Sequence, residues 1–341
     1  MLLNQPLLTI VIPCYNEEEV LNSTICQLSN VLEDLISESL ISKHSRLLFV
    51  DDGSKDRTWQ IIRERHVNQF HVTGLKLARN VGHQKALLAG LEKARKTSDC
   101  VISIDADLQD DTAVIKDFIL KYLDGCDIVY GVRKKRTTDT FFKRTTATGF
   151  YKFMTSIGIP LVPNHADYRL MSKRALEELS KFTESNLFLR GIVPIIGFKS
   201  ACIYYDRKER LAGETKYPLK KMLSFAFDGI TSFSIAPIRF ITILGFILFL
   251  LSGVAGGYAL IQKFYGYTSS GWTSLIISIW FLGGLQLISI GLLGEYIGKI
   301  FVESKRRPKY AVETDLFTSP VENMKSKRAR IILEEMKQSS K

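Results

Sequence analysis

The stretch Val101-Ile102-Ser103-Ile104-Asp105-Ala106-Asp107-Leu108-Gln109-Asp110 decides the fold class of this chain. A short run of β-favouring residues ends abruptly in two carboxylates one residue apart, followed by an amide and a third carboxylate. This pattern predicts a buried strand whose carboxyl end opens onto a loop, which is where ligands bind in open α/β sheets. The oxygen ligands suit a hard divalent cation such as Mg²⁺ or Mn²⁺. An acidic turn that caps the next helix, from Asp111 onward, is the competing interpretation.

Three more strands are predicted before this stretch, at residues 8–13, 46–50 and 72–77, and one after it, at 127–131. A helical pattern runs from about residue 18 to residue 36, with Asn16 as its N-cap, and other helices follow the second and third strands, the latter reaching about Lys93. Strands that alternate with helices every ~25 residues indicate parallel βαβ units.

Polar side chains follow three of the predicted strands at their carboxyl ends. They are Tyr15 and Glu17, Asp51 and Asp52, and Asp105 and Asp107. Parallel strands bring such ends to one edge of the sheet, so these groups are expected to converge, although three ordinary loops would give the same pattern. No GxGxxG follows the first strand, which disfavours a dinucleotide-binding domain.

The composition indicates a polar globular part joined to a very apolar one. Of 341 residues, 46% are hydrophobic while 24% are charged. The net charge of +11 suits a membrane surface or an anionic substrate, because no nucleic-acid-binding motif is visible. The five cysteines are dispersed without CxxC spacing, as expected of core residues in a reducing compartment. The sequence contains no HExxH motif, which disfavours a zinc hydrolase. We see no signal peptide.

The apolar part predicts membrane segments. An amphipathic interface helix with a basic start is expected from Leu219. Residues 240–261 and 272–294 contain no charged residue, and each stretch exceeds the ~20 residues that span a bilayer core. Basic residues flank the outer ends of this pair, which places both termini in the cytoplasm and only the short link outside. Two buried core helices are the alternative. Beyond Val312 we expect a charged tail, flexible or in contact with another copy, with a short helix around residues 329–337.

Four motifs in order resemble the family 2 glycosyltransferases. They are Ile-Val-Ile-Pro-Cys-Tyr-Asn-Glu-Glu (10–18), Val-Asp-Asp-Gly-Ser-Lys-Asp-Arg-Thr (50–58), Ala-Arg-Asn-Val-Gly-His-Gln-Lys-Ala (78–86) and Asp-Ala-Asp-Leu-Gln-Asp (105–110). The resemblance covers roughly residues 7–308. It is strongest to the polyprenyl-phosphate branch, which includes dolichyl-phosphate mannose synthases and bacterial undecaprenyl-phosphate glucosyltransferases.

The resemblance implies a GT-A nucleotide-sugar-binding α/β domain with a mostly parallel sheet, at 1–217. Amphipathic interface helices (218–238), a two-helix transmembrane domain (239–303) and a cytoplasmic tail (304–341) would follow. In this family's pattern Pro13, Tyr15, Glu17 and Asp52 hold the nucleoside. Asp105, with Ala106 beside it, lies near the ribose or the metal, and Asp107 and Gln109 ligate the Mg²⁺ or Mn²⁺ that bridges the donor diphosphate.

The resemblance also assigns the acceptor side. Arg133 and Arg144, in a basic segment that could equally be a solvated loop, are placed at the acceptor phosphate. Asp167 joins Asp105 and Asp107 as a catalytic candidate in contact with sugar or acceptor, whereas Arg169 is as readily structural. The segment 207–217 resembles the family's Arg-x-x-Gly-x-Ser-Lys-Tyr, with Thr215 in the serine position. Arg210 and Lys216 would then clamp the diphosphate as a lid, unless the segment is only a basic linker.

The expected activity is that of a hexosyltransferase: inverting transfer of one sugar from a nucleotide-sugar to a polyprenyl (undecaprenyl) phosphate for cell-envelope glycosylation. UDP-glucose and UDP-N-acetylglucosamine lead as donors, with GDP-mannose behind. A phosphate monoester has a second pKa of about 6, so the acceptor is already an anionic nucleophile near neutral pH. Expected partners are membrane lipid, a second copy of the chain through glycine-lined helices, a flippase and a downstream glycosyltransferase.

Two rival functions compete with this expectation. A processive polysaccharide synthase would carry Gln-x-x-Arg-Trp, but no arginine precedes Trp59, Trp272 or Trp280. A non-catalytic membrane scaffold that binds sugar nucleotides is disfavoured by the intact Asp-Ala-Asp motif.

Overall fold

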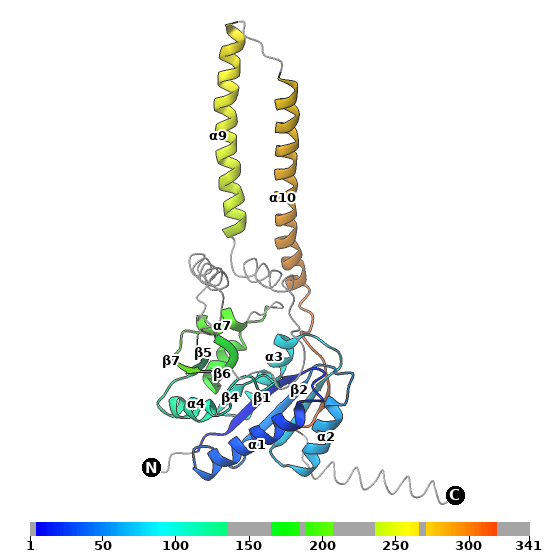
Figure 1. The fold of residues 1–341 in the computed structure, drawn as a ribbon, viewed down its shortest axis with the longest axis vertical. Helices are drawn as coiled ribbons and strands as arrows, with labels where there is room; N and C mark the ends of the chain where they lie inside the picture. The colour runs from blue at the N-terminus through cyan, green and yellow to red at the C-terminus, as the bar shows by residue number, and fades with distance from the viewer. Residues whose placement is uncertain (1–4, 135–164, 185–188, 207–235, 266–270, 319–341) are drawn as a thin grey trace, which may run out of the picture. The chain divides into compact units, whose positions relative to one another are not determined.

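A computed structural model of the chain describes residues 5–134, 165–184, 189–206, 236–265 and 271–318 (Figure 1). The chain divides into two compact units. The first comprises residues 1–151, 160–216 and 308–341, and the second comprises 152–159 and 217–307. Each unit is described by itself below.

The described residues of the first unit form an eight-stranded sheet in the order β7-β5-β6-β4-β1-β2-β3-β8. Its strands are β1 (Leu8–Cys14), β2 (Arg46–Asp51), β3 (Val72–Leu77), β4 (Cys100–Ser103), β5 (Ile128–Arg133), β6 (His165–Ser172), β7 (Ser200–Tyr205) and β8 (Val312–Asp315). All run in one direction except β6 and β8, which pair antiparallel with their neighbours. The predicted mostly parallel sheet is therefore confirmed.

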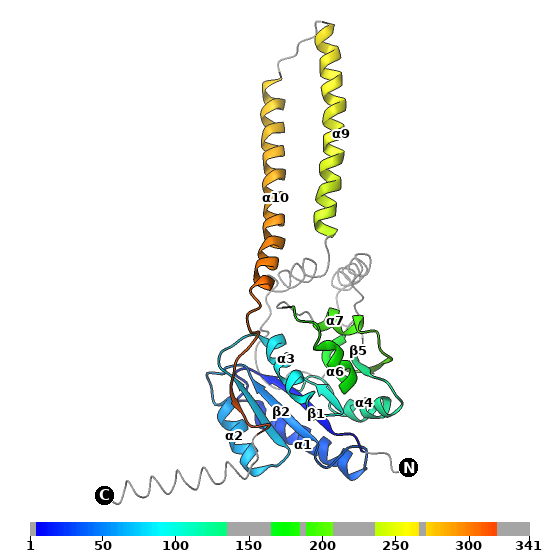
Figure 2. The ribbon, with the colours of Figure 1, turned by 180° about the vertical axis from the view of Figure 1, so that it is seen from behind.

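Helices cover the sheet of the first unit on both faces (Figures 1 and 2). They are α1 (Leu21–Ser37), α2 (Thr58–Asn68), α3 (His83–Ala94), α4 (Val114–Leu123), α6 (Lys173–Leu179) and α7 (Leu189–Ile195). The chain winds from β1 through β2 to β3 on one side and then returns to place β4 on the other side of β1. Such a switch in strand order opens a crevice at the carboxyl ends of the strands, where ligands bind in this kind of sheet.

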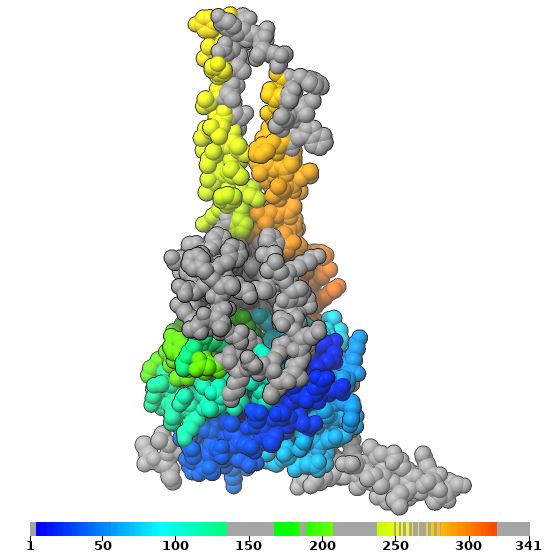
Figure 3. All heavy atoms as spheres, viewed as in Figure 1, coloured from blue at the N-terminus to red at the C-terminus, as the bar shows by residue number. Residues whose placement is uncertain are grey.

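The core between α1 and the sheet follows from helical periodicity. Leu21, Ile25, Leu28 and Leu32 recur on one face of α1 and are fully buried together with the strand side chains. Burying each such side chain contributes roughly 1.5–3 kcal/mol. The space-filling view shows α1 and the segments beside it, in blue, as a continuous cover on that side of the unit (Figure 3). This packed layer fixes the start of each loop at the sheet edge.

The start of the first helix differs from the prediction. Asn16 is not its N-cap, because α1 begins at Leu21. Asn16 instead lies in the left-handed region with φ of 52°, and its side-chain oxygen accepts a hydrogen bond from the backbone N–H of Lys55 at 2.9 Å. Asparagine tolerates this conformation, so the residue joins two loops of the sheet edge rather than capping a helix.

Residues after Val312 also differ from the prediction, since they are not a flexible tail as far as the structure describes them. β8 pairs with β3 at the sheet edge, and Arg46 Nη1 donates to the backbone oxygen of Phe317 at 3.1 Å. Lys93 pairs with Asp315. β8 has only four residues and is mostly polar, so its sequence shows no alternation of apolar and polar residues that would predict a strand. Its pairing with β3 is what makes it a strand.

All five cysteines are free thiols. Cys14, Cys100 and Cys126 are buried, whereas Cys26 and Cys202 are exposed, so the expectation that all of them belong to the core was wrong for these two.

The described residues of the second unit form two long helices, α9 (Ala236–Phe264) and α10 (Trp272–Ser304), which contain the two predicted apolar stretches. Large apolar side chains on both helices stay more than half exposed, among them Phe246, Tyr258, Leu287 and Ile290. Within the described residues, one helical stretch, Phe281–Ser304, is long and apolar enough to cross a membrane, and a shorter apolar one covers Pro237–Leu248. Two membrane spans therefore stay a prediction. The predicted interface helix at 218–238 and the helix at 329–337 fall wholly or almost wholly outside the described residues.

Candidate active site

The polar ends of β1, β2 and β4 meet at one edge of the sheet, as the sequence predicted. β6 adds to this edge because it runs antiparallel, so that its first residues lie beside the last residues of β4, with Ser103 opposite Arg169. The Ser103 hydroxyl donates to the backbone oxygen of Asp167. The antiparallel strand thereby brings a carboxylate from far along the chain to the Asp105–Asp110 loop.

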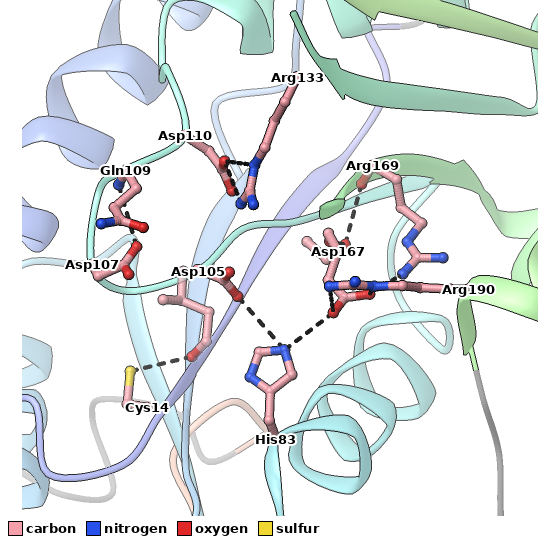
Figure 4. A network of polar contacts seen from close by, with 12 residues as sticks. Cys14, His83, Asp105, Asp107, Gln109, Asp110, Arg133, Asp167, Arg169 and Arg190 are labelled. Carbon is pink, nitrogen blue, oxygen red and sulfur yellow. Dashed lines mark hydrogen bonds and ion pairs between the residues drawn. The ribbon is translucent and has the colours of Figure 1, made fainter. Parts of the chain in front are cut away.

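The loop after β4 carries the carboxylates that opened the sequence argument. Thr24 of α1 donates a hydrogen bond to the backbone oxygen of Ala106 at 2.6 Å, which anchors the loop from below. Leu108 adopts a φ of 53°, and the backbone N–H of Gln109 then donates to Asp107 Oδ1 at 3.2 Å. The side chains of Asp107 and Gln109 consequently lie next to each other (Figure 4).

Asp105 points the other way, toward His83 (Figure 4). Its side chain keeps 35% of its surface exposed, and His83 Nε2 lies 3.6 Å from its Oδ1. Burial among protein atoms raises the pKa of Asp105 to about 6; His83 opposes this shift, and the carboxylates of Asp110, Asp167 and Asp107 add to it. The charged form of Asp105 is therefore disfavoured beside these carboxylates unless a cation is bound.

Asp52 holds the loop that carries His83. Its two carboxylate oxygens accept the backbone N–H groups of Val81 and Gly82, at 2.8 and 2.9 Å. Gly82 has a φ of 94°, a backbone conformation that residues other than glycine rarely adopt. α3 begins immediately after it, with His83. Burial raises the pKa of Asp52, while the two backbone N–H groups counteract it. Asp52, predicted to hold the nucleoside, thus already orders a loop of the site.

Asp167 is enclosed by three cationic or protonatable groups (Figure 4). Arg169 Nη2 lies 2.5 Å from Oδ1, Arg190 Nη2 lies 3.1 Å from Oδ2, and His83 Nε2 lies 3.5 Å from Oδ2. Burial would raise the pKa of Asp167, but Arg190, His83 and Arg169 outweigh burial and hold it well below its usual range. A carboxylate this firmly anionic is a poor proton acceptor and a good electrostatic anchor.

Arg133, at the end of β5, is paired with Asp110. The guanidinium donates to Asp110 Oδ1 from Nε at 3.1 Å and from Nη2 at 2.9 Å. The hydroxyl of Tyr205, at the end of β7, donates to the same oxygen at 2.5 Å. Arg133 therefore lies at the sheet edge with a partner that the sequence did not suggest, and its predicted contact with the acceptor phosphate stays a prediction.

The other predicted residues of the first strands also lie at this edge. Pro13 is buried near the end of β1 opposite Val50, Tyr15 is 36% exposed just beyond the strand, and the backbone N–H of Glu17 donates to Thr58. Arg144, Arg210 and Lys216 lie outside the described residues, so their predicted roles stay predictions.

Sequence reasoning missed four members of the site: His83, Asp110, Arg190 and Tyr205. His83 stood within a quoted motif directly after a predicted strand, and that position was the available signal. Asp110 was visible as the third carboxylate of the opening stretch. Arg190 and Tyr205 carry no local pattern, since their partners are 23 and 95 residues away along the chain.

The donor atoms at Asp107 and Gln109 fit the predicted divalent cation. Both offer oxygens, one carboxylate and one amide, on a single loop with a fixed backbone. Among the described residues no group of three or more His, Cys, Asp or Glu side chains forms a closed cage. A cation with one or two protein oxygens and the rest from substrate phosphates is the usual arrangement for Mg²⁺ in phosphate chemistry.

The doubly wound sheet, its carboxylate loop after β4 and the crossing antiparallel β6 define a GT-A type nucleotide-sugar-binding domain. Residues 9–180 match the family described as glycosyl transferase family 2. The chain belongs to that family.

Relatives extend the similarity over most of the chain. It is 67% identical to an uncharacterized glycosyltransferase, YkoT, of Bacillus subtilis (strain 168), over 95% of this chain and 97% of that protein. It is 40% identical to the bactoprenol glucosyl transferase of Shigella phage SfV, over 90% of this chain and 98% of that protein. It is 39% identical to the prophage bactoprenol glucosyl transferase homolog of Escherichia coli (strain K12), over 90% and 98% of the two chains.

Proposed function

We propose that the chain transfers a single sugar, with inversion, from a nucleotide-sugar to the phosphate of a polyprenyl lipid. UDP-glucose is the first choice of donor and UDP-N-acetylglucosamine the second. One observation carries the proposal: a loop whose carboxylate and amide oxygens suit a divalent cation lies at the same sheet edge as a group of arginines, in a family 2 glycosyltransferase. The similarity covers nearly the whole length of relatives that are named as bactoprenol glucosyl transferases, which supports a lipid phosphate as the acceptor.

The donor side of the reaction depends on Asp107 and Gln109. These two residues would hold Mg²⁺ or Mn²⁺, which stabilises the charge that develops on the departing nucleoside diphosphate. Asp52 and Gly82 set the shape of the loop beside the nucleotide, and Asp105 lies between that loop and the metal ligands. Pro13, Tyr15 and Glu17 would contact the nucleoside.

The acceptor side needs charge and orientation more than proton transfer. An oxygen of the lipid phosphate attacks the anomeric carbon, a new carbon–oxygen bond forms, and the bond to the nucleoside diphosphate breaks. Because the phosphate is already anionic, no proton has to be removed from the nucleophile. Arg133 would bind that phosphate, and Asp167, which stays ionised, would serve as the anchor of His83 and Arg190.

We also propose that the enzyme is a cell-membrane protein with two spans, formed within α9 and α10, and that both termini face the cytoplasm. The support is the length of the two helices, their exposed apolar side chains and the basic residues at their outer ends. A reporter that works only in the cytoplasm should be active when it is fused to the C-terminus, and a reporter that works only outside the cytoplasm should be inactive there. The reverse result would contradict the proposed topology.

Transfer by the purified full-length chain tests the function. The protein, in detergent with Mg²⁺ or Mn²⁺ and undecaprenyl phosphate, is incubated separately with labelled UDP-glucose, UDP-N-acetylglucosamine and GDP-mannose. We expect label in the lipid fraction with one donor, dependence on the cation, and an inverted anomeric linkage by NMR. Absence of lipid-linked product with every donor would overturn the proposal, and product only on a sugar hydroxyl would indicate a polysaccharide synthase instead.

A further inference from the structure

The guanidinium of Arg133 is held in place by two side chains that have no role in the proposed function, Asp110 and Tyr205. Its Nε and Nη2 both face Asp110 Oδ1, and Nε also lies 3.3 Å from the hydroxyl oxygen of Tyr205. The Tyr205 hydroxyl itself donates to Asp110. The three groups form a closed triangle, which we call the Arg133 mount (Asp110, Arg133 and Tyr205).

The mount is not arranged for stability alone. All the donors converge on Oδ1 of Asp110, while its Oδ2 is buried and finds no hydrogen-bond partner among the described residues. A carboxylate that served only as a salt bridge would gain more by using both oxygens in a two-pronged pair. A buried polar atom without a partner costs free energy and calls for another explanation. Orientation of the arginine provides one.

The surroundings keep Tyr205 in place. Its ring meets the ring of Tyr168 edge-on, with centroids 5.5 Å apart and planes at 84°. The Tyr168 hydroxyl donates to the backbone oxygen of Asp111 at 3.0 Å, which ties the same wall to the loop that carries Asp110. Gly131 makes this approach possible, because a Cβ there would lie 2.9 Å from the backbone oxygen of Tyr168 and 3.1 Å from the Tyr205 ring. The phenol is thus a rigid support.

The side of Arg133 that faces away from Asp110 remains available. Within the described residues no hydrogen bond uses its Nη1, and 28% of the side chain is exposed. Its guanidinium points into the same space as the side chain of Asp105 (Figure 4). A guanidinium held at one edge by a carboxylate can offer its other edge to phosphate oxygens, whose spacing it matches.

We propose that Asp110 and Tyr205 are positioning residues, which fix Arg133 so that its Nη1 edge meets the phosphate of the acceptor lipid. This inference rests on the proposed function. Asp110 directly follows Gln109, so the mount also fixes Arg133 relative to the loop with the metal ligands. In-line transfer depends on such a fixed separation of nucleophile and leaving group.

Tyr205→Phe is the most selective test, because it removes one hydroxyl and keeps the ring packing. The KM for undecaprenyl phosphate should rise about 3- to 10-fold, less than the full effect of a hydrogen bond to a charged group, because the hydroxyl acts on the acceptor only through Arg133. The kcat and the KM for the nucleotide-sugar should change less than about 2-fold. Tyr204→Phe is the matched control, since Tyr204 lies on the same strand, points to the other face and is 62% exposed; it should leave all three constants unchanged.

A double-mutant cycle separates positioning from general structural support. Arg133→Ala should raise the acceptor KM by at least about 30-fold, the effect of truncating a hydrogen-bonded charged partner. If Tyr205 acts only through Arg133, Arg133→Ala combined with Tyr205→Phe should equal Arg133→Ala alone. Asp110→Asn keeps an acceptor oxygen and should be milder than Asp110→Ala; should Asp110→Ala fail to fold, Asp110→Asn and Tyr205→Phe still decide.

The outcomes distinguish the inference from the function beneath it. An unchanged acceptor KM in Tyr205→Phe, equal losses in acceptor and donor KM, or additive effects in the cycle would overturn the inference while wild-type transfer to lipid still upheld the proposed function. No transfer to lipid by the wild-type chain would overturn both.

Discussion

The two halves of the sheet build their parts of the site in different ways. In the half formed by β1 to β4, each polar loop directly follows its strand, and its contacts are mostly to backbone groups of neighbouring loops, as for Asp52 with Val81 and Gly82. In the half formed by β5 to β7, the site depends on side-chain pairs. Asp167 alone takes partners from β6, α3 and α7.

In the first half, residues proposed for the reaction can therefore be changed with little effect on the stability of the fold. In the second half, the same side chains serve the site and stabilise the fold. Asp107 is only partly buried, and its carboxylate accepts a hydrogen bond from the backbone of its own loop. Asp167 balances the charge of Arg169, which is only 2% exposed, so removing Asp167 would leave a buried charge. Mutations in the two halves should therefore fail in different ways.

Asp107→Ala should give the largest effect, a loss of activity with little loss of stability. Loss of a ligand to the cation that stabilises the leaving group should lower kcat about 10³-fold, whereas the free energy of unfolding should fall by only about 1 kcal/mol, the effect of losing the hydrogen bond from the Gln109 backbone. Transfer assays and denaturant unfolding of the same preparation measure both. Asp117→Ala, on the exposed face of α4, is the control. Transfer retained in Asp107→Ala would remove its metal role.

Asp167→Asn, in the second half of the sheet, should mainly lower the stability of the fold. The substitution keeps the shape but leaves the guanidinium groups of Arg169 and Arg190 without their counter-charge, so the free energy of unfolding should fall by about 3 kcal/mol. Denaturant unfolding checks this value. Glu178→Gln, in an exposed pair with Lys181, should change it by less than about 0.5 kcal/mol. Equal stability of the two variants would show that the Asp167 cluster is not a structural anchor.

Asp315→Asn should give the smallest effect and sharpens the comparison at the far edge of the first half. Its pair with Lys93 is partly exposed, so we expect a loss of about 1 kcal/mol in the free energy of unfolding. Glu313→Gln, in the more exposed pair with Lys76, is the control and should cost less. A loss as large as that of Asp167→Asn would contradict the view that side-chain pairs dominate only the second half.

The loss in Asp315→Asn should also depend on pH. Burial raises the pKa of Asp315, but hydrogen bonds from Lys93 and Thr318 outweigh it and leave the pKa below its usual value. A carboxyl whose pKa is lower in the folded than in the unfolded chain stabilises the fold above the unfolded pKa, about 3.9, and loses that contribution as the pH falls below it. The difference between wild type and variant should therefore shrink between pH 6 and pH 3.

Most of the first half could be predicted from sequence. Apolar runs that end in Asp51 and Asp105 mark the strands and the direction in which their loops open, because a parallel βαβ unit repeats the same local order. The errors there were local too. Asn16 was assigned to a helix cap because its side chain suits caps, although the left-handed turn at this position suits asparagine equally well.

The second half and the last strand could not be predicted in this way. Nothing near Asp167 in sequence indicates Arg190, and nothing near Asp110 indicates Tyr205, because these contacts exist only once β5, β6 and β7 have paired. β8 is short and polar, and its place beside β3 depends on Lys93 and Arg46, more than 200 residues earlier.

The sequence by itself therefore determined the fold class, the family and the position of the carboxylate loop after β4, since strand periodicity and short motifs are local properties of the chain. Only the tertiary structure decided how the carboxylates are used: Asp107 beside Gln109, Asp105 toward His83, Asp167 enclosed by arginines and Asp110 behind Arg133. The physical reason is that the role of a charge depends on which opposite charges surround it and how deeply they are buried. Both are set by contacts between distant segments.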